Sequence, residues 1–361
     1  MLSYVRLSSF SFSPISKGMG RYYRSRHLSA LGAPPRLSLK PDEPRRCHVQ
    51  QRRTLAATPH YDIKKVGVVG LGLMGHGIGL VSAQAGYEVI AVEAQAPALE
   101  SGKKRIDKSL SKILSKAVEK GKMTLEAAEK EKEKVERRIT YSLDLAALRD
   151  ADLVVEAIVE NLDVKIPFYK QLGSLVKPTA IFGSNTSSLK IGDFAAPSGR
   201  PQQFVGLHFF NPVQLMRLVE IVRLHETEPA VFETVRGYVA RIGKTAVTCQ
   251  DTPGFIVNRL LVPALVQAML MKERGEASVE DIDVAMQLGA GHPMGPLHLA
   301  DYIGLDTCLF ILEGWVKKYP NEPAFIVPSS LRALVQGGKL GRKSGEGFYV
   351  WEGDKKVKPA M

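Results

Sequence analysis

Residues 64–95, KKVGVVGLGLMGHGIGLVSAQAGYEVIAVEAQ, decide the fold of this chain. The run VGVVG is short, apolar and β-branched, which is typical of a parallel strand buried on both faces. A helical pattern follows and ends at Gly86, and a second strand, EVIAVE, closes with Glu93. Between the first strand and the helix stand four glycines: Gly70, Gly72, Gly75 and Gly77. The stretch therefore predicts a strand, a glycine turn, a helix and a second strand within about 30 residues.

Strands and helices continue to alternate downstream. Buried strands are predicted at ADLVVEAIV (residues 151–159), AIFGSN and FVGLHFFNP, and KIPFYKQLGSLV has a helical pattern. This alternation predicts an α/β domain, a Rossmann-like doubly wound and mostly parallel sheet, over residues 62–246. Residues 97–138 are highly charged and predict a helical hairpin inserted in that domain, with its turn near Gly121.

The pattern changes near residue 247, where strand signals give way to helical ones and a glycine-broken tail, GRKSGEGFYVW, comes last. Four segments have a helical pattern: 256–274, 278–289, 299–318 and 329–336. We therefore expect residues 247–361 to form a second, all-α domain at the C-terminus.

The N-terminal segment carries most of the charge. The 361-residue chain has a formal net charge of +12, and residues 1–55 contribute +9 of it, with 11 Lys and Arg against Asp42 and Glu43. This segment is rich in Arg and Ser and lacks the apolar core of a secretory signal, so it fits a mitochondrial transit peptide. A disordered basic arm or a mistaken start codon are the alternatives. The remaining +3 gives no sign of a nucleic-acid partner.

Composition argues against several other classes of protein. The chain is 45% hydrophobic and 24% charged, which is typical of a globular protein. Its cysteines, Cys47, Cys249 and Cys308, show no paired spacing, which argues against a disulfide framework or a zinc site. No run of about 18 uninterrupted apolar residues occurs, so no membrane span is expected.

GLGLMG, residues 70–75, is a G-x-G-x-x-G sequence in the context that dinucleotide binding requires, after a strand and before a helix. The first glycine permits the tight turn, the second lets the backbone approach a pyrophosphate, and the third allows close helix–strand packing. Glu93 stands where a carboxylate accepts the ribose hydroxyls and repels a 2′-phosphate, which favours NAD over NADP. A glycine-rich turn in another α/β protein is the alternative. The candidate cofactor loop comprises Gly70, Leu71, Gly72, Leu73, Met74 and Gly75.

A basic stripe follows in the first helix of the hairpin, where lysines recur at four-residue spacing and so share one face. Its members are Lys104, Lys108, Lys112 and Lys116. Ser109 stands seven residues before Lys116 and can share that face. The stripe is either a solvated surface or a docking strip for a ligand with several phosphates, and these residues alone leave both interpretations open.

Polar residues also follow two of the predicted strands. Glu160 and Lys165 come just after the strand at 151–159, and SNTSSL, residues 184–189, follows the next one. The carboxyl ends of parallel strands form the edge of the sheet where ligands bind. The small hydroxyl and amide groups of SNTSSL could donate to a ligand carbonyl, or could equally cap the next helix.

GLHFFNPVQLMRLVEIV, residues 206–222, is nearly all apolar but contains His208 and Glu220. His208 lies near the carboxyl end of its strand, on the edge of the sheet that carries the other polar features. A nicotinamide enzyme that oxidises an alcohol needs a base for the hydroxyl proton, and an imidazole suits that task. Glu220, on the next strand, could fix the tautomer of the ring. A buried, satisfied histidine and a surface glutamate would be the structural alternative.

The chain resembles the L-3-hydroxyacyl-CoA dehydrogenases of fatty-acid β-oxidation, specifically the mitochondrial, monofunctional short-chain type. The resemblance runs from about Lys64 to Trp351 and rests on many stretches together. They are GLGLMGHGI, DLVVEAIVENLDVK, SNTSSL, GLHFFNPVQLMRLVE, DTPGFIVNRLLVPALVQA, GAGHPMGP, DYIGLDT and GRKSGEGFY.

The resemblance implies a role for each matching residue. His208 matches the catalytic base, Glu220 its carboxylate partner, and Ser187 and Asn258 the residues that position the substrate near the nicotinamide. The implied reaction is the NAD-dependent oxidation of (S)-3-hydroxyacyl-CoA to 3-oxoacyl-CoA in the mitochondrial matrix. A homodimer joined through the C-terminal domain is implied as well. Positions that contact NAD are matched by Glu160, Lys165, Ser187, Asn211 and Lys343, and those that contact coenzyme A by Ser109 and Lys116.

The chain departs from the family pattern at three positions. Glu93 replaces the usual Asp, Gln214 stands where a small or Pro-like residue is more usual, and His292 replaces a common aromatic. These changes concern cofactor affinity and chain-length preference. Two other functions stay open on the residues alone: a β-hydroxyacid dehydrogenase for free acids, which normally uses a catalytic Lys, and a binding or structural protein on the same scaffold.

Overall fold

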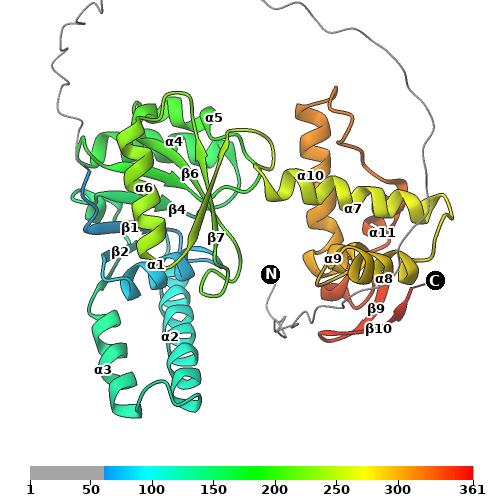
Figure 1. Ribbon diagram of the computed structural model, residues 1–361. Helices are drawn as coiled ribbons and strands as arrows, with labels where there is room; N and C mark the ends of the chain where they lie inside the picture. The colour runs from blue at the N-terminus through cyan, green and yellow to red at the C-terminus, as the bar shows by residue number, and fades with distance from the viewer. Residues whose placement is uncertain (1–60, 361) are drawn as a thin grey trace, which may run out of the picture. The chain divides into compact units, whose positions relative to one another are not determined.

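The computed structural model describes residues 61–360 (Figure 1). The transit peptide expected over residues 1–55, and Cys47 with it, lies outside the described residues. An eight-stranded sheet with its helices comes first along the chain, and a mainly helical region follows. This architecture confirms the expected α/β fold with its helical C-terminal region.

The sheet has the strand order β3-β2-β1-β4-β5-β6-β7-β8. β1 pairs in parallel with β2 on one side and with β4 on the other, so the strand order reverses beside β1. Ligands bind in the crevice beyond the carboxyl ends of the strands at such a switch point. β7 runs antiparallel to β6, and β8 runs parallel to β7. The strands are β1 Lys65–Val69, β2 Glu88–Val92, β3 Ile139–Ser142, β4 Leu153–Glu156, β5 Ile181–Ser184, β6 Phe204–Phe209, β7 Leu218–Arg223 and β8 Thr245–Gln250.

Helices cover both faces of the sheet, and each face has its own hydrophobic core. One core joins the sheet to α1 and α6, and the other joins it to α4 and α5. Two strands had no sequence prediction: β3, which pairs with β2, and β8, which runs through the predicted boundary at residue 246. The helices of this part are α1 Gly75–Gln84, α2 Ala96–Glu119, α3 Leu125–Glu136, α4 Leu162–Leu175, α5 Gly192–Ala195 and α6 Pro229–Arg241.

The first strand–helix unit is buried on nearly every side. Val66 and Val68 of β1 are fully enclosed, and α1 is buried along almost its whole length. A Cβ on Gly77 would lie only 2.7 Å from the Cβ of Val213. Glycine at this position therefore lets the loop after β6 pack against the first turn of α1, which brings two parts of the site together.

The expected helical hairpin is present as α2 and α3, which run side by side (Figure 1). Leu110 and Leu114 of α2 are buried in the core that also contains Ala128 and Val135 of α3, while the lysines of the basic stripe are exposed. Lys132 of α3 forms an ion pair with Asp107 of α2, with 2.6 Å between the charged atoms. This alternation of buried leucines and exposed lysines explains how so charged a helix is held.

The C-terminal region packs around its own core. The helix expected over 299–318 is two helices, because Gly304 has φ +105° and ends the first of them. The tail expected to be irregular is a hairpin of β9 Tyr349–Glu352 and β10 Lys355–Pro359, an addition to the predicted all-α domain. Its turn contains Gly353 with φ +60°, the conformation that tight hairpins need. The helices are α7 Val257–Glu273, α8 Val279–Gly289, α9 Pro296–Ile303, α10 Leu305–Lys318 and α11 Ser329–Gln336.

Three negative findings apply to residues 61–360. No helix there is long and apolar enough to cross a membrane. No group of three or more His, Cys, Asp or Glu side chains in that range could hold a metal ion. Both cysteines of that range, Cys249 and Cys308, are free, and burial raises the pKa of each thiol to about 12.

Candidate active site

The glycine loop between β1 and α1 leaves space for a ligand at its centre. Gly70 has φ +88°, and a Cβ on it would lie 2.6 Å from the carbonyl oxygen of Ala157. A Cβ on Gly75 would lie 1.7 Å from the carbonyl oxygen of Gly70, whereas one on Gly72 would meet nothing within 4 Å. The start of α1 has no acidic residue and no side-chain cap, so the positive end of the helix dipole is available to an anion. The loop therefore fits the pyrophosphate of a dinucleotide.

Glu93 lies beside this loop and is fixed by backbone donors. Its Oε2 accepts the N–H of Leu71 at 2.8 Å, and its Oε1 accepts the N–H of Ala94 at 2.9 Å. The Glu93 carboxylate thus folds back onto the backbone of the glycine loop. Each oxygen keeps a second lone pair, so the group can still accept ribose hydroxyls.

His208 and Glu220 lie directly opposite each other on β6 and β7. His208 Nδ1 is 2.6 Å from Glu220 Oε2, and the two residues are 5% and 0% exposed. The second oxygen, Oε1, accepts the N–H of Ile256 at 3.1 Å and that of Val257 at 2.8 Å. A carboxylate that accepts these bonds leaves Nδ1 as the donor, so Nε2 is the unprotonated nitrogen of the ring.

The start of α7 stabilises this pair through the backbone N–H groups of Ile256 and Val257. The positive end of a helix dipole stabilises the Glu220 carboxylate, which lies at the helix N-terminus. Phe255, two residues before α7 begins, has φ +55°, an unusual value for a residue other than glycine. Its ring lies 5.5 Å from the His208 ring, and the ring of Phe210 lies 4.5 Å away, centroid to centroid. The imidazole is therefore held by one carboxylate and two aromatic walls.

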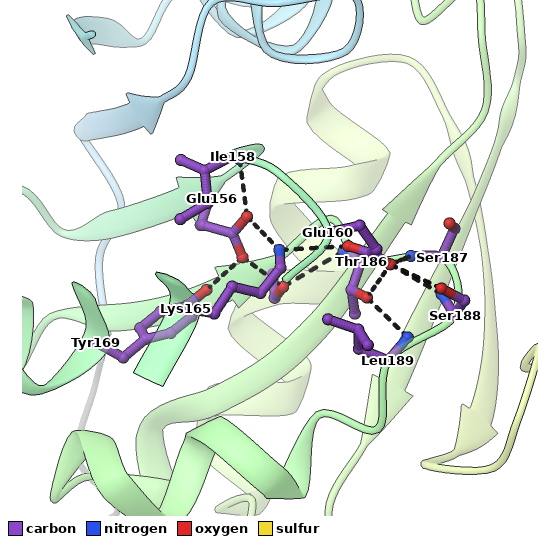
Figure 2. A network of polar contacts seen from close by, with 10 residues as sticks. Glu156, Ile158, Glu160, Lys165, Tyr169, Thr186, Ser187, Ser188 and Leu189 are labelled. Carbon is purple, nitrogen blue, oxygen red and sulfur yellow. Dashed lines mark hydrogen bonds and ion pairs between the residues drawn. The ribbon is translucent and has the colours of Figure 1, made fainter. Parts of the chain in front are cut away.

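Figure 2 shows Glu160 turned into the loop that follows β5. Its Oε1 accepts the Thr186 hydroxyl at 2.5 Å, the Ser187 N–H at 2.9 Å, and the Ser188 N–H and hydroxyl at 3.1 and 3.2 Å. Burial alone would raise the pKa of Glu160, but the charge of Lys165 and these donors outweigh it and lower that pKa. Most polar groups of SNTSSL are thus used within the protein, and α5 begins only at Gly192.

Ser187 is the exception in this loop. Its carbonyl accepts the side-chain amide of Asn258 at 3.4 Å, and its hydroxyl has no partner among residues 61–360. Asn185 ties the same loop to β6, because its Oδ1 accepts the N–H of Phe209 at 2.9 Å. The loop therefore presents the Ser187 hydroxyl beside the strand that carries His208.

The ammonium of Lys165 lies between Glu156 and Glu160, and the residue is 1% exposed (Figure 2). Its Nζ is 2.5 Å from Oε1 of Glu156, a fully buried carboxylate, and 3.5 Å from Oε2 of Glu160. The resemblance predicts that Lys165 contacts the cofactor, whereas its ammonium lies inside the protein between two carboxylates. Glu156 accepts three further hydrogen bonds: from the Ile158 N–H at 2.8 Å, the Ser184 hydroxyl at 2.7 Å and the Tyr169 hydroxyl at 3.1 Å.

Residues predicted to bind the cofactor and residues predicted to act on the substrate line one cavity of about 430 Å³. The glycine loop lines one part of it, and the residues predicted to act on the substrate line another. Its lining comprises Leu73, Met74, Ala157, Ile158, Glu160, Asn185, Ser187, His208, Phe209, Phe210, Asn211 and Asn258. A ligand in this cavity would therefore reach from the first turn of α1 to the imidazole.

Three predicted residues lie on other surfaces, apart from both the glycine loop and the cavity. Ser109 is half-buried and Lys116 exposed on α2, with the rest of the basic stripe. Lys343 stands in the short 3₁₀ turn Arg342–Ser344, and its Nζ lies 2.5 Å from the carboxylate of Asp306 on α10. The structure therefore brings the catalytic candidates together and leaves these three on other surfaces.

One pair in the site was missed by the sequence analysis. His76, in the first turn of α1, has its Nδ1 2.9 Å from the Gly72 carbonyl and its Nε2 3.2 Å from Nε2 of Gln214. Burial lowers the pKa of His76, so the ring is neutral at pH 7, donating to Gly72 and accepting from Gln214. The departure at Gln214 is thus matched by a partner in the first turn of α1, which no local sequence signal could indicate.

Comparison with known protein families identifies the family of this chain. The NAD binding domain of 3-hydroxyacyl-CoA dehydrogenase matches residues 65–252, and the C-terminal domain of the same enzyme matches residues 254–351. The chain belongs to the 3-hydroxyacyl-CoA dehydrogenase family. Its cofactor is therefore NAD and its class is oxidoreductase, as expected from the glycine loop and His208.

Individual relatives agree with the family assignment. The human mitochondrial hydroxyacyl-coenzyme A dehydrogenase is 47% identical over 291 residues, covering 80% of this chain and 92% of the human protein. A probable 3-hydroxybutyryl-CoA dehydrogenase of Deinococcus radiodurans is 48% identical, covering 80% and 100%. Among solved structures, the (S)-3-hydroxybutyryl-CoA dehydrogenase of Ralstonia eutropha superimposes with a TM-score of 0.75 at 38% identity, covering 81% and 100%. The relatives from human and rat are named as mitochondrial enzymes, which supports a mitochondrial location for this chain.

Proposed function

We propose that His208 and Glu220 carry the proton transfer when this enzyme oxidises (S)-3-hydroxyacyl-CoA to 3-oxoacyl-CoA. The observation that carries the proposal is the 2.6 Å contact from Nδ1 to a fully buried carboxylate, which leaves Nε2 to the cavity that His208 lines. Bound NAD supplies the hydride acceptor. Nε2 accepts the proton of the 3-hydroxyl group, and Glu220 stabilises the imidazolium that forms.

Ser187 and Asn258 orient the substrate beside the imidazole. Both line the cavity, and the Asn258 amide lies 3.4 Å from the Ser187 carbonyl. The free Ser187 hydroxyl can donate to an oxygen of the substrate. A second donor from the Asn258 amide would fix the thioester and place the 3-hydroxyl in reach of His208.

The cofactor site runs from Gly70 to the wall of the same cavity. Gly72 leaves room for the pyrophosphate, and Glu93 accepts the adenosine ribose hydroxyls. Asn211 and Glu160, both in the cavity wall, contact the nicotinamide end. We assign Lys343 to the cofactor as well, on the family resemblance.

Coenzyme A docks on the exposed face of α2. Ser109 and Lys116 contact it, and the other lysines of the stripe raise the local positive potential that a phosphorylated ligand requires. The acyl chain then extends toward the cavity, where the oxidation takes place.

The C-terminal domain, residues 247–361, joins two subunits in a homodimer. Large apolar side chains are exposed on three of its helices: Leu260 on α7, Leu288 on α8 and Phe310 on α10, with 70%, 83% and 67% of their surface exposed. Exposed apolar residues of this size support an interface with a second copy. The enzyme works in the mitochondrial matrix, where residues 1–55 act as a transit peptide and are removed.

The experiment that tests this function is the reduction of acetoacetyl-CoA by the purified enzyme, followed as loss of NADH at 340 nm. The same assay with NADPH tests Glu93, and free 3-hydroxybutyrate in the reverse direction tests the need for coenzyme A. Turnover with NADH and the thioester only is expected. His208→Gln should abolish most turnover with NADH binding retained; full activity in that variant would remove His208 from the mechanism.

A further inference from the structure

We propose that Glu156 and Lys165 set the charge of the cofactor cavity, so that the affinity of the enzyme for the oxidised, positively charged nicotinamide is raised relative to that for the reduced one. The inference rests on the proposed function, because it requires the nicotinamide to lie in the cavity that His208 lines. The hydride acceptor must stand beside the carbon whose hydroxyl meets His208, so the ring belongs in the same cavity.

The feature that carries the inference is a buried group of two carboxylates and one ammonium: Glu156, Glu160 and Lys165 (Figure 2). A Lys and a Glu are seldom fully buried unless they are paired. One carboxylate would have been enough to pair Lys165. The second leaves the group with a net charge of −1 inside the sheet domain.

The distances assign this excess charge to Glu160. Lys165 Nζ is 2.5 Å from Glu156 and 3.5 Å from Glu160. Glu156 also accepts three neutral donors, so its acceptor sites are occupied within the protein. Glu156 therefore takes most of the ammonium charge, and Glu160 keeps most of its own.

Glu160 is the member of the group that meets the ligand. Its side chain is 28% exposed and lines the cavity, while those of Glu156 and Lys165 are 0% and 1% exposed. The partners of its Oε1 are the N–H and hydroxyl donors of Thr186, Ser187 and Ser188, which are all uncharged. The wall of the cavity therefore carries a negative charge that no second cation neutralises within the group.

A negative wall acts differently on the two forms of the cofactor. The oxidised nicotinamide ring is positively charged and the reduced ring is neutral, so the wall lowers the free energy of the oxidised form only. Partial burial strengthens the attraction relative to that in water. We expect this to favour the oxidised form by about tenfold in affinity, which corresponds to about 30 mV in the midpoint potential of the bound cofactor. Glu156 and Lys165 are positioning residues in this scheme, because they act through Glu160.

The test is Glu156→Gln in the complete enzyme. Glutamine keeps the shape and an acceptor oxygen for Lys165, but it removes one negative charge. Lys165 then neutralises Glu160 instead. Isothermal titration of NAD⁺ and NADH, without substrate, should show the NAD⁺ dissociation constant rising about tenfold relative to that of NADH.

Two further variants separate charge from packing. In Glu156→Gln/Lys165→Met both buried charges are gone, the group carries −1 again, and the affinity ratio should return to that of the wild type. Tyr169→Phe removes a neutral hydrogen bond to Glu156 at 3.1 Å without changing any charge, so the ratio should stay unchanged. If Glu156→Gln does not fold, Glu160→Gln also removes one negative charge from the group, at the residue that lines the cavity. It should shift the ratio of NAD⁺ to NADH affinity in the same direction.

Equal weakening of both cofactor forms in the single variants would mean that the group has only a structural role, and an unchanged ratio would also overturn the proposal. Failure of the proposed catalytic function gives a different result: a fully active His208→Gln enzyme whose affinity ratio still responds to Glu156→Gln. A wild-type enzyme that binds neither form would overturn both, since the cavity would not be the cofactor site.

Discussion

Glu220→Gln tests the geometry of the catalytic pair most directly. The amide oxygen of Gln can keep the N–H groups of Ile256 and Val257, which now donate to Oε1 at 3.1 and 2.8 Å. The amide nitrogen then faces Nδ1 of His208 across the present 2.6 Å contact. Two donors cannot share that contact, so the ring must transfer its proton to Nε2, and the nitrogen that faces the cavity can no longer act as a base.

The expected size of the effect follows from this change of tautomer. Replacing the carboxylate that orients a catalytic histidine by an amide lowers kcat by about 10³–10⁴-fold in another His-dependent enzyme. That loss corresponds to about 4–5.5 kcal/mol of transition-state stabilisation. The free energy of unfolding should fall by only about 1–3 kcal/mol, because one charge-assisted hydrogen bond is lost while the backbone donors keep their acceptor.

Three measurements separate these effects: steady-state kinetics with acetoacetyl-CoA, NADH binding by fluorescence, and urea unfolding. Glu228→Gln is a matched control: Glu228 accepts a hydrogen bond from the Tyr61 hydroxyl at 2.9 Å, and it does not line the cavity. The control should retain wild-type kcat, and both variants should retain NADH affinity. A Glu220→Gln enzyme with kcat within about tenfold of wild type would refute the assigned tautomer, and loss of NADH binding would show that the pair belongs to another site.

Three further predictions concern the cofactor loop, pH and assembly. Gly75→Ala should destabilise the fold and abolish NADH binding, because its Cβ would lie 1.7 Å from the Gly70 carbonyl, whereas Gly72→Ala should weaken NADH binding with little change in melting temperature. Asp152 accepts the N–H groups of Lys64 and Lys65 at 2.8 and 2.7 Å and forms an ion pair with Lys177. Burial alone would raise the pKa of Asp152, but the effect of these partners is larger and lowers that pKa. A carboxyl group whose pKa is lowered in the folded state contributes stability above its unfolded pKa, and this contribution is lost as pH falls through the folded pKa. Asp152→Asn should therefore cost about 1–3 kcal/mol in urea unfolding near pH 7, and the cost should become progressively smaller as pH falls below about 4. Leu288→Lys, at a side chain that is 83% exposed, should convert a dimer to a monomer in light scattering, and a variant that remains dimeric would place the interface elsewhere.

The sequence allowed the glycine loop and the pairing of His208 with Glu220 to be predicted because both depend on short-range patterns. The spacing of Gly70, Gly72 and Gly75, together with the strand before it and the helix after it, indicated the loop. His208 and Glu220 lie on consecutive strands whose antiparallel register places them opposite each other. Strand β3, by contrast, is only four residues long with one buried side chain, Ile139, too short for a periodic signal.

The remaining features depend on contacts between distant segments. Glu156 and Glu160 stand only nine and five residues before Lys165, but a lysine in the first turns of a helix is normally exposed, and no sequence pattern shows that this one turns back between the two carboxylates. The pairing of His76 with Gln214 joins residues 138 positions apart. Which polar groups of SNTSSL remain free was equally invisible, because Glu160, more than 20 residues earlier, decides it.

A single short segment aligns the base and the substrate. Gly254 and Phe255 are both in the left-handed region, with φ +76° and +55°, and this turn directs the next N–H groups to Glu220 and the Asn258 amide to the Ser187 carbonyl. For Phe255 such a conformation costs about 1–3 kcal/mol, and it persists only where the surroundings impose it. Trp315 packs against the preceding residue, since a Cβ on Gly254 would lie 2.6 Å from its ring. Because the same turn contacts Glu220 and carries Asn258, we expect the proposed base and the proposed substrate-positioning amide to shift together, and the strain in Phe255 to be the energetic cost of holding both in one geometry.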